Sequence, residues 1–395
     1  MIPSRRHKAA EKEALIQQAL NGLANGTYNS AHYAATKLNI PRSTLYDRQR
    51  GLNSHAQAHE SEQNLSLPEE RELVKWVTQL TIVGYPASHG LVHEMAEVIR
   101  KRRVASINDS SIEHVSYKPL GKKWTYRFLL RHPELRTVIG DDIELARLKE
   151  ASRETINHWF HTIASIIADN NIWPQDIYNM DESGFSIGMI EATRVIVNAT
   201  LGTRFQANPG RQEWVSVIEC ISADGSSIAP LLIFKGETMS TGWCPDNVPA
   251  KWQVSCNSKG WTSNNHGADW LCVCFELQTR EKADGRKRLL ICDGHDSHIS
   301  GEFIGHCMNN NILLVVLPPH TSHLLQPLDV SIFSPLKKAL SARVDRLIRT
   351  GVACLRKVEW FECYIEAREV VFIARNIHGG WRGAGLFPID KQKVL

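Results

Sequence analysis

The sequence is short of the features that mark secreted and membrane proteins. None of its nine cysteines precedes Cys220, and no pair of them has the spacing of a structural zinc site. No apolar run approaches the roughly 18 residues that a membrane helix needs, and no apolar segment follows the basic residues at the N-terminus. We therefore expect a soluble intracellular protein in a reducing compartment, with no membrane as a partner.

A strong net charge is also missing, because 46 basic and 42 acidic residues leave only +4 over 395 residues. The charge is nevertheless unevenly placed. Residues 1–56 carry a net +5 and residues 100–136 a net +7, whereas the segment between them and the remaining chain are acidic. Basic segments ahead of an acidic body indicate modules that bind a polyanion. The length and the 43% hydrophobic content predict two or three globular domains.

The pattern of residues 1–56 predicts three short helices. The first spans residues 9–23, Ser30 caps the second with Tyr33 facing the core, and Pro41 opens the third. A short, basic, hydroxyl-rich helix after a tight turn is typical of a helix-turn-helix that enters the major groove. The alternative is a plain three-helix bundle whose third helix faces solvent. The predicted DNA contacts on the third helix are Arg42, Ser43, Thr44, Tyr46, Arg48 and Arg50.

Residues 57–137 predict a second helical module. Ser66–Glu69 has the pattern of a capping box ahead of an apolar stripe, and a later helix begins near Gly121. Trp124 and Phe128 of that later helix are expected in the core. Its basic residues suit contacts to DNA phosphates. The predicted phosphate contacts are Lys122, Lys123, Arg127 and Arg131.

After a predicted linker at 138–150, residues 151–395 alternate strands and helices. The predicted elements are a helix at 151–170, strands at 177–185, 194–198, 214–221 and 228–234, buried strands at 288–292 and 312–317, a helix at 299–309 and a long helix at 330–349. Antiparallel strands followed by alternating helix and strand predict a ribonuclease-H-like α/β domain. The chain is therefore expected to be multidomain, with two all-α helix-turn-helix modules ahead of this domain.

Three aspartates lie where the predicted elements end or begin. Asp181 interrupts the first strand, Asp293 ends a buried strand, and Asp329 precedes the long helix. Carboxylates at strand ends can converge at one sheet edge, and two magnesium ions about 4 Å apart need such shared oxygen ligands. Each aspartate alone also fits a turn residue or a helix cap. Their occurrence together behind two DNA-binding modules favours a metal site, with Glu182 and Asp296 as lower-ranked alternatives.

Other residues in this domain leave alternatives open. The histidines near the second and third aspartates are His295, His298, His320 and His323. Because they flank loops, hydrogen bonds to carboxylates or DNA phosphates are favoured over zinc binding. The tryptophans between Trp243 and Trp270 fit core packing better than stacking on bases. Lys337 and Lys338 fit phosphate contacts and a solvated face equally well.

Motifs along the chain resemble those of one family. Residues 34–51 resemble the pipsqueak-type helix-turn-helix, and residues 121–135 look like the second helix-turn-helix of centromere protein B. This pair precedes the catalytic domain in pogo/Tigger-type transposases of the mariner superfamily, and the resemblance covers roughly residues 8–390. The three segments similar to that family's catalytic motif blocks are Asn179–Phe185, Asp293–His298 and Pro318–Val330.

The resemblance implies a DDE transposase, here with three aspartates, that cuts and joins DNA at the ends of a mobile element. Asp181, Asp293 and Asp329 would be its catalytic residues and hold Mg²⁺, or Mn²⁺ in its place, for phosphodiester hydrolysis and transesterification. The helical modules would bind double-stranded DNA, namely terminal inverted repeats, and the site would also engage target DNA. A homodimer on DNA and a location in the nucleus are further implications.

Two other functions remain open. The first is a domesticated or truncated, catalytically inactive DNA-binding protein with a centromere-like or regulatory role. The second is a metal-dependent nuclease unrelated to mobility, which would cleave DNA without joining strands. Members of the resembled family often continue past the Gly-Leu-Phe-Pro motif, whereas this sequence stops at Leu395. A truncation there would affect activity and assembly more than the fold.

Overall fold

The computed structural model describes residues 5–52, 63–82, 85–110, 117–137, 148–187, 213–295, 298–350 and 355–395. Two compact units can be distinguished, the first made of residues 1–75 and 99–138 and the second of residues 76–98 and 139–395. The predicted strand at 194–198, most of the predicted linker at 138–150 and Asp296 lie outside the described residues. No helix in the described part of the chain is both long and apolar enough to cross a membrane.

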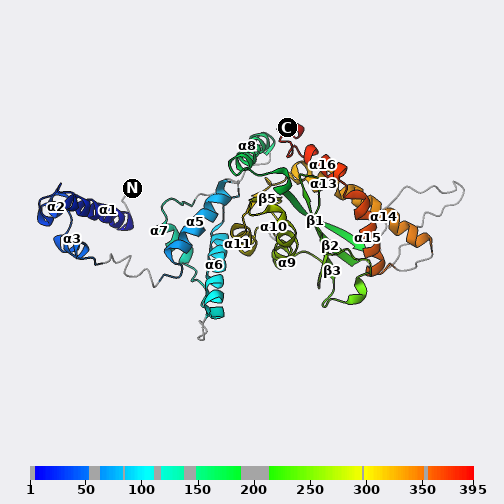
Figure 1. Cartoon of the computed structure of the whole chain (residues 1–395), viewed down its shortest axis with the longest axis horizontal. Helices are drawn as coiled ribbons and strands as arrows, with labels where there is room; N and C mark the ends of the chain where they lie inside the picture. Colours follow the sequence, from blue (N-terminus) through cyan, green and yellow to red (C-terminus); the bar gives the residue numbers. More distant parts are fainter. Residues whose placement is uncertain are drawn as a thin grey trace. The chain divides into compact units, whose positions relative to one another are not determined.

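The first three helices form a small bundle (Figure 1). They are α1 (Arg5–Ala24), α2 (Ala31–Lys37) and α3 (Arg42–Gln49). Ser30 caps α2 as predicted, because its side chain accepts a hydrogen bond from the N–H of Tyr33 at 3.2 Å. The prediction that Tyr33 faces the core is wrong. Tyr33 is 52% exposed, since Ala34 and Ala35 form the buried face of this short helix.

Three further helices follow, namely α5 (Leu67–Ile82), α6 (His89–Ser110) and α7 (Trp124–Arg131). The predicted capping box at the start of α5 is confirmed. The N–H of Ser66 donates to Glu69 Oε2 at 2.7 Å, and the N–H of Glu69 donates to Ser66 Oγ at 3.4 Å. Trp124 and Phe128 of α7 are buried, as expected, with their rings stacked 5.2 Å apart.

A buried carboxylate connects α5 to the end of α7. Glu70 is fully buried, and it accepts hydrogen bonds from Arg131 Nε at 3.0 Å and lies 3.0 Å from His132 Nε2. Burial raises the pKa of Glu70, but the hydrogen bonds from His132 and Arg131 outweigh burial and lower it below its usual value. The hydrogen bond to Glu70 in turn raises the pKa of His132. A charge buried this deeply is tolerated only when it is paired, so the three residues fix α7 against α5.

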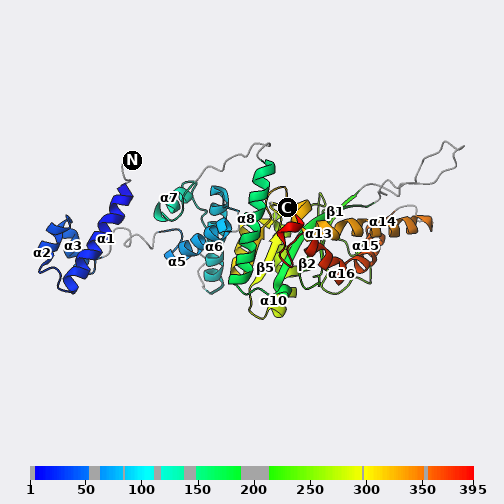
Figure 2. The same ribbon diagram turned by 90° about the horizontal axis from the view of Figure 1, so that it is seen from above.

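A six-stranded mixed sheet forms the centre of the second unit (Figures 1 and 2). In spatial order its strands are β4 (Gln253–Asn257), β3 (Leu231–Lys235), β2 (Glu213–Ser222), β1 (Ile177–Ile187), β5 (Arg288–Cys292) and β6 (Ile312–Val316). β1, β2 and β3 pair antiparallel, whereas β5 is parallel to both β1 and β6. This is the predicted ribonuclease-H-like arrangement. β4, which pairs parallel to β3 at the edge, is an additional strand.

Helices cover both faces of this sheet. On one face, a single core contains Ile177 and Val217 of the sheet together with residues of several helices. Those helices are α8 (Leu148–Asp169), α13 (Pro327–Ser331), α14 (Phe333–Arg349), α15 (Lys357–Val371) and α16 (Ala374–Gly383). On the other face, Tyr178 contacts Phe275, whose ring lies 5.1 Å away. Phe275 belongs to η4 (Trp270–Glu276), a π-helical turn between α9 (Asn264–Asp269) and α10 (Leu277–Ala283), with α11 (Gly301–Asn309) beside it.

The remaining elements are short. They are η2 (Pro174–Asp176), η3 (Thr241–Trp243), α12 (Ser322–Leu325) and η6 (Lys391–Lys393). The prediction of one helix at 330–349 is corrected in one respect. The structure has α13 from Pro327 and then α14 from Phe333, so Asp329 lies inside a first helical turn instead of ahead of the helix.

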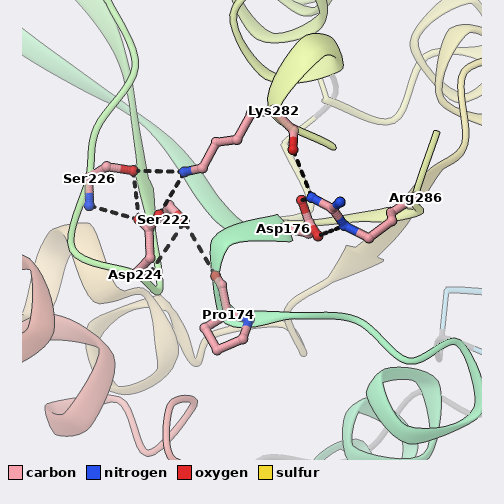
Figure 3. Close-up of polar contacts among 7 residues, drawn as sticks. All are labelled: Pro174, Asp176, Ser222, Asp224, Ser226, Lys282 and Arg286. Atoms are coloured by element: carbon pink, nitrogen blue, oxygen red, sulfur yellow. Dashed lines mark hydrogen bonds and ion pairs between the residues drawn. The ribbon is translucent and has the colours of Figure 1, made fainter. Parts of the chain in front are cut away.

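Polar contacts close the end of the sheet at which β1 begins (Figure 3). Asp176 is fully buried and accepts a hydrogen bond from Arg286 Nε at 2.8 Å. Arg286 also donates to the carbonyl of Lys282, whose Nζ donates to Asp224 Oδ2 at 2.6 Å. Asp224 lies in the turn between β2 and β3, where Gly225 has a φ of +91°. These contacts tie the start of β1 to that turn and to the connection before β5.

Replacing Glu70 with glutamine should destabilise the helical module, because Arg131 and His132 lose their carboxylate. We expect a loss of about 3 kcal/mol, the order found when one partner of a buried ion pair is removed. Amide hydrogen exchange of the full chain, followed by mass spectrometry, should show faster exchange in α5 and α7. Glu72→Gln is the matched control on the same helix, since its ion pair with Lys75 is solvent-exposed and such pairs contribute little. Equal exchange in both variants would contradict the structural role of Glu70.

Candidate active site

The three predicted aspartates come from three elements of the second unit. Asp181 lies within β1 and is only 7% exposed, Asp293 follows β5 directly, and Asp329 lies in the first turn of α13. Asn179 of β1 pairs with Ile291 of the parallel strand β5. Asp181 and Asp293 each lie two residues beyond this pair, and they therefore lie at the same end of the two parallel strands.

The charges of these carboxylates act on one another. Burial raises the pKa of Asp181 well above its usual value, and the negative charges of Asp329 and Asp293 raise it further. The pKa of Asp329 is also raised, by partial burial and by Asp293, although Lys337 and His323 oppose the increase. Neighbouring carboxylates cannot all ionise cheaply unless a proton or a cation offsets the repulsion. This edge of the sheet would therefore be stabilised by a bound cation.

A buried histidine joins two acidic side chains of the site. His298 is 1% exposed, with Nδ1 lying 2.9 Å from Asp293 Oδ1 and Nε2 lying 2.9 Å from Glu182 Oε1. Burial lowers the pKa of His298, but the hydrogen bonds and charges of Asp293 and Glu182 outweigh burial and raise it to about 9. A protonated imidazole donates to both carboxylates. His298 thus contacts carboxylates, which is the role that the sequence favoured over zinc binding.

The donor set fits a hard divalent cation, because carboxylate oxygens are the ligands that Mg²⁺ and Mn²⁺ prefer. Within the described residues, however, no three His, Cys, Asp or Glu side chains converge closely enough to hold an ion as they stand. Asp181 Oδ1 accepts the N–H of Glu182 at 2.8 Å, and Asp293 Oδ1 is bonded to His298. An ion held by both aspartates would share their carboxylates with these hydrogen bonds.

Two buried amides link the elements that carry the aspartates, and sequence reasoning missed them. Asn179 and Gln326 are both fully buried, and Asn179 Nδ2 donates to Gln326 Oε1 at 2.8 Å and to the carbonyl of Ile291 at 3.1 Å. Asn179 Oδ1 accepts the N–H of Leu328 at 3.3 Å, and Gln326 Nε2 donates to the carbonyl of Met180 at 2.9 Å. We call these two residues the amide clamp.

Each partner of the amide clamp is close in sequence to one of the aspartates. Met180 and Leu328 directly precede Asp181 and Asp329, and Ile291 lies two residues before Asp293. The clamp therefore sets the distances between β1, β5 and α13 at the site. A signal in the sequence was the presence of two amides in otherwise apolar, buried segments, because a buried amide must find hydrogen-bonding partners.

Two of the three aspartates open onto a cleft of about 270 Å³ in the second unit. Asp181 and Asp293 line it together with His298, Trp214 and Trp261. A further cleft of about 330 Å³ shares Gly184 and Trp214 with the first and contains Lys337. Lys337 also acts electrostatically on Asp329. A basic side chain thus lies close to the end of the sheet that carries Asp181, Asp293 and Asp329, which we call the acidic edge.

Most of the residues predicted to contact DNA through α3 are accessible. Arg42, Ser43, Tyr46 and Arg50 are exposed, whereas Leu45 of the same helix is fully buried. The other two predicted contacts, Thr44 and Arg48, are partly buried. Arg48 Nη1 donates to the carbonyl of Leu52 at 2.9 Å and so helps to close the end of α3.

The predicted contacts near α7 divide into two groups. Lys122, Lys123 and Arg127 are exposed at or near the start of the helix. Arg131 is instead bound to the buried Glu70, so the structure gives it a stabilising partner that the sequence did not reveal. Contact between Arg131 and DNA phosphate stays a prediction.

The other candidate residues of the ribonuclease-H-like domain differ in their exposure to solvent. Trp270 is fully buried, in agreement with core packing, but Trp261 is 61% exposed. His320, His323 and Lys338 are exposed. Glu182, the lower-ranked alternative ligand, contacts His298.

Two family models match parts of the chain. A family model described as DDE superfamily endonuclease matches residues 211–381, and one described as Tc5 transposase DNA-binding domain matches residues 67–138. The chain therefore has a region similar to the Tc5 transposase DNA-binding domain ahead of a region similar to DDE superfamily endonucleases. The endonuclease match includes Asp293 and Asp329, whereas Asp181 precedes it.

Several known proteins are similar to the chain. The "MFS-type transporter clz9" of Cochliobolus lunatus is 30% identical over 92% of this chain and 34% of its own length. The "Pogo transposable element with KRAB domain" of Mus musculus is 27% identical over 36% of this chain and 23% of its own length. The chain thus spans about a third or less of these relatives. The solved Mos1 strand transfer complex covers 100% of this chain and 99% of its own, with 10% identity and a TM-score of 0.39.

Alanine at either position of the amide clamp should destabilise the second unit, because buried partners are left without hydrogen bonds. We expect Asn179→Ala and Gln326→Ala each to cost about 2 kcal/mol. The double variant should cost less than the sum of the two, because the residues share one network. Urea unfolding of the full chain measures these changes. Asn170→Ala is the control, since Asn170 directly follows α8, donates to the carbonyl of Ile166 in that helix and otherwise accepts only from the exposed Lys287 among the described residues. Strict additivity would contradict a shared network.

Proposed function

We propose that the chain is a metal-dependent DNA endonuclease that cuts and joins DNA at the ends of a mobile element. The observation that carries the proposal is the placement of Asp181 on β1, Asp293 directly after the parallel strand β5 and Asp329 on α13, where the charges of Asp329 and Asp293 add to the effect of burial on Asp181. The DDE superfamily endonuclease match over residues 211–381 supports the same chemistry. Asp181, Asp293 and Asp329 are proposed as the catalytic residues.

The three aspartates would hold Mg²⁺, or Mn²⁺ in its place. When bound, the ions supply an activated water and stabilise the leaving 3′ oxygen of a phosphodiester. The chain's own residues prepare the site. The amide clamp holds β1, β5 and α13 in register, and His298 orients the carboxylates of Asp293 and Glu182. Lys337 offers a positive charge to a phosphate entering beside Asp329.

The partners follow from the helical modules. The exposed residues of α3 and the basic residues at the start of α7 are proposed to contact double-stranded DNA at terminal inverted repeats. Target DNA would reach the cleft lined by Asp181 and Asp293, here called the acidic cleft, after cleavage. We propose that the chain acts as a homodimer on DNA in the nucleus, where its substrate is found.

A second candidate function is a DNA-binding protein that does not cleave. It is favoured by the observation that no described group of three acidic or histidine side chains is ready to hold an ion. This candidate predicts specific DNA binding without nicking at any concentration of Mg²⁺ or Mn²⁺. The variants below separate the two functions.

Nicking of plasmid DNA that carries the sequences flanking the coding region tests the proposed site. Asp181→Asn, Asp293→Asn and Asp329→Asn should each lower Mg²⁺-dependent nicking at least about 100-fold, since even indirect partners of a metal cost 10- to 100-fold. Asp284→Asn is the matched control, because Asp284 is exposed and has a φ of +47°, which asparagine also accepts. Unchanged nicking by the three site variants would sink the assignment, and no nicking by the unaltered chain would select the second candidate.

Neutral residues at Lys122 and Arg127 should weaken binding to duplex DNA of any sequence. Each lost phosphate contact is expected to reduce the slope of log affinity against log salt by about 0.9. Fluorescence anisotropy at several salt concentrations measures the slope. Lys391→Gln in η6 is the control, since Lys391 is exposed but lies outside the helical modules and has no proposed DNA contact. An unchanged slope in Lys122→Gln and Arg127→Gln would rule out these contacts.

A further inference from the structure

Two exposed tryptophans border the acidic cleft. Trp214 of β2 is 42% exposed and Trp261 is 61% exposed, and both line the cleft that contains Asp181 and Asp293. Their ring centroids lie 6.3 Å apart, and the ring planes are inclined by 56°, so the rings form a corner and not a stack. Single exposed apolar residues are common on protein surfaces. Two tryptophans at the mouth of one cleft present a much larger flat apolar surface to an incoming molecule.

A side-chain-built turn holds Trp261 in place. Asn257 Oδ1 accepts the N–H groups of Lys259 and Trp261 at 3.0 and 3.3 Å, as well as that of Gly260. Asn257 Nδ2 donates to the carbonyl of Trp261, and Ser216 Oγ of β2 donates to the carbonyl of Gly260 at 3.0 Å. Trp261 is therefore exposed on an ordered turn that is fastened to the sheet, which lowers the entropy cost of binding a ligand.

One glycine makes the space for this corner, and a second lies beside it. Gly260 has a φ of +70°, and a Cβ atom there would lie 2.5 Å from the carbonyl oxygen of Trp214, so only glycine lets the turn approach β2. The ring of Trp214 lies beside Gly184 of β1, where a Cβ atom would be in van der Waals contact with it at 3.7 Å. Gly184 is three residues from Asp181. The aromatic corner is thus held directly beside the acidic edge.

We propose that Trp261 and Trp214 bind an unpaired nucleobase of the DNA strand whose phosphate lies at the aspartates. Trp261 would stack on the base, and Trp214 would form the wall of the corner. This inference rests on the proposed function, because the aspartates place a phosphodiester in the same cleft. A base next to that phosphate must leave its duplex partner to reach a tryptophan face. Stacking suits any base, since every base has a flat aromatic face.

Binding of single-stranded oligodeoxythymidylate to the full chain tests the proposal. Ca²⁺ replaces Mg²⁺ in the assay, so that binding is measured without cleavage. Trp261→Ala should weaken binding about 5- to 100-fold, the range for the loss of one stacked base. Trp261→Phe should restore most of the affinity, because phenylalanine keeps a stacking face. Trp214→Ala should also weaken binding, and the exposed position of Trp261 keeps the test valid if the strand variant fails to fold.

Trp173→Ala is the matched control. Trp173 is 54% exposed, but Arg286 covers one face of its ring at 5.0 Å, and it is not among the residues lining the acidic cleft. We expect its single-strand affinity to equal that of the unaltered chain. Equal losses in Trp173→Ala and Trp261→Ala, or no rescue by Trp261→Phe, would overturn the proposal. A Trp261→Ala variant that binds DNA normally but loses self-association in light scattering would instead assign the corner to a second copy of the chain.

Two further measurements separate this inference from the proposed function. Duplex binding by the helical modules should be the same in all tryptophan variants. If the unaltered chain never nicks DNA while single-strand binding still depends on Trp261, the endonuclease proposal fails and the base-binding site stands. If nicking depends on the aspartates while Trp261→Ala binds single strands normally, the base-binding site fails alone.

Discussion

The hydrogen bonds between Asn179 and Gln326 bring together segments that are 147 residues apart and bear two of the three aspartates. In a buried location these amides are satisfied by one another, by the nearby backbone and, for Gln326, by the side chain of Asp181. Any shift of α13 against β1 would leave several polar groups without partners, at a cost of about 1–3 kcal/mol each. The arrangement of the acidic edge therefore depends on this uncharged contact more than on the aspartates, whose charges repel one another.

The buried carboxylates of the chain have two opposite electrostatic surroundings. Glu70 in the helical module and Glu219 in the sheet are matched by cations, since Arg131 and His132 bind the first and Arg368 binds the second. Asp181 has no such cation in the described structure. Burial raises its pKa, and the charges of Asp329 and Asp293 raise it further. Paired carboxylates hold elements together, whereas a carboxylate left among like charges is suited to gathering a cation.

Basic and aromatic side chains surround the acidic edge. The buried His298 contacts the carboxylates of Asp293 and Glu182, and Lys337 opposes the rise in the pKa of Asp329. The exposed face of the cleft is aromatic, with Trp261 held on the turn that Asn257 builds. A negatively charged strand would meet cations and flat apolar surfaces at the same place. Such a combination suits a nucleic acid better than a small acidic metabolite.

Local patterns in the sequence determined much of this protein, including the cap at Ser30, the capping box at Ser66 and the order of the central strands. They also singled out Asp293 at the end of a strand, because helix and strand signals depend on neighbouring residues, whereas Asp181 lies within β1. β4 escaped prediction because a short, half-buried edge strand has no clear alternation. Only the tertiary structure decided that Glu70 holds Arg131, that Asn179 meets Gln326 and that Trp261 stays exposed. Those outcomes depend on contacts between distant segments, which no local pattern encodes.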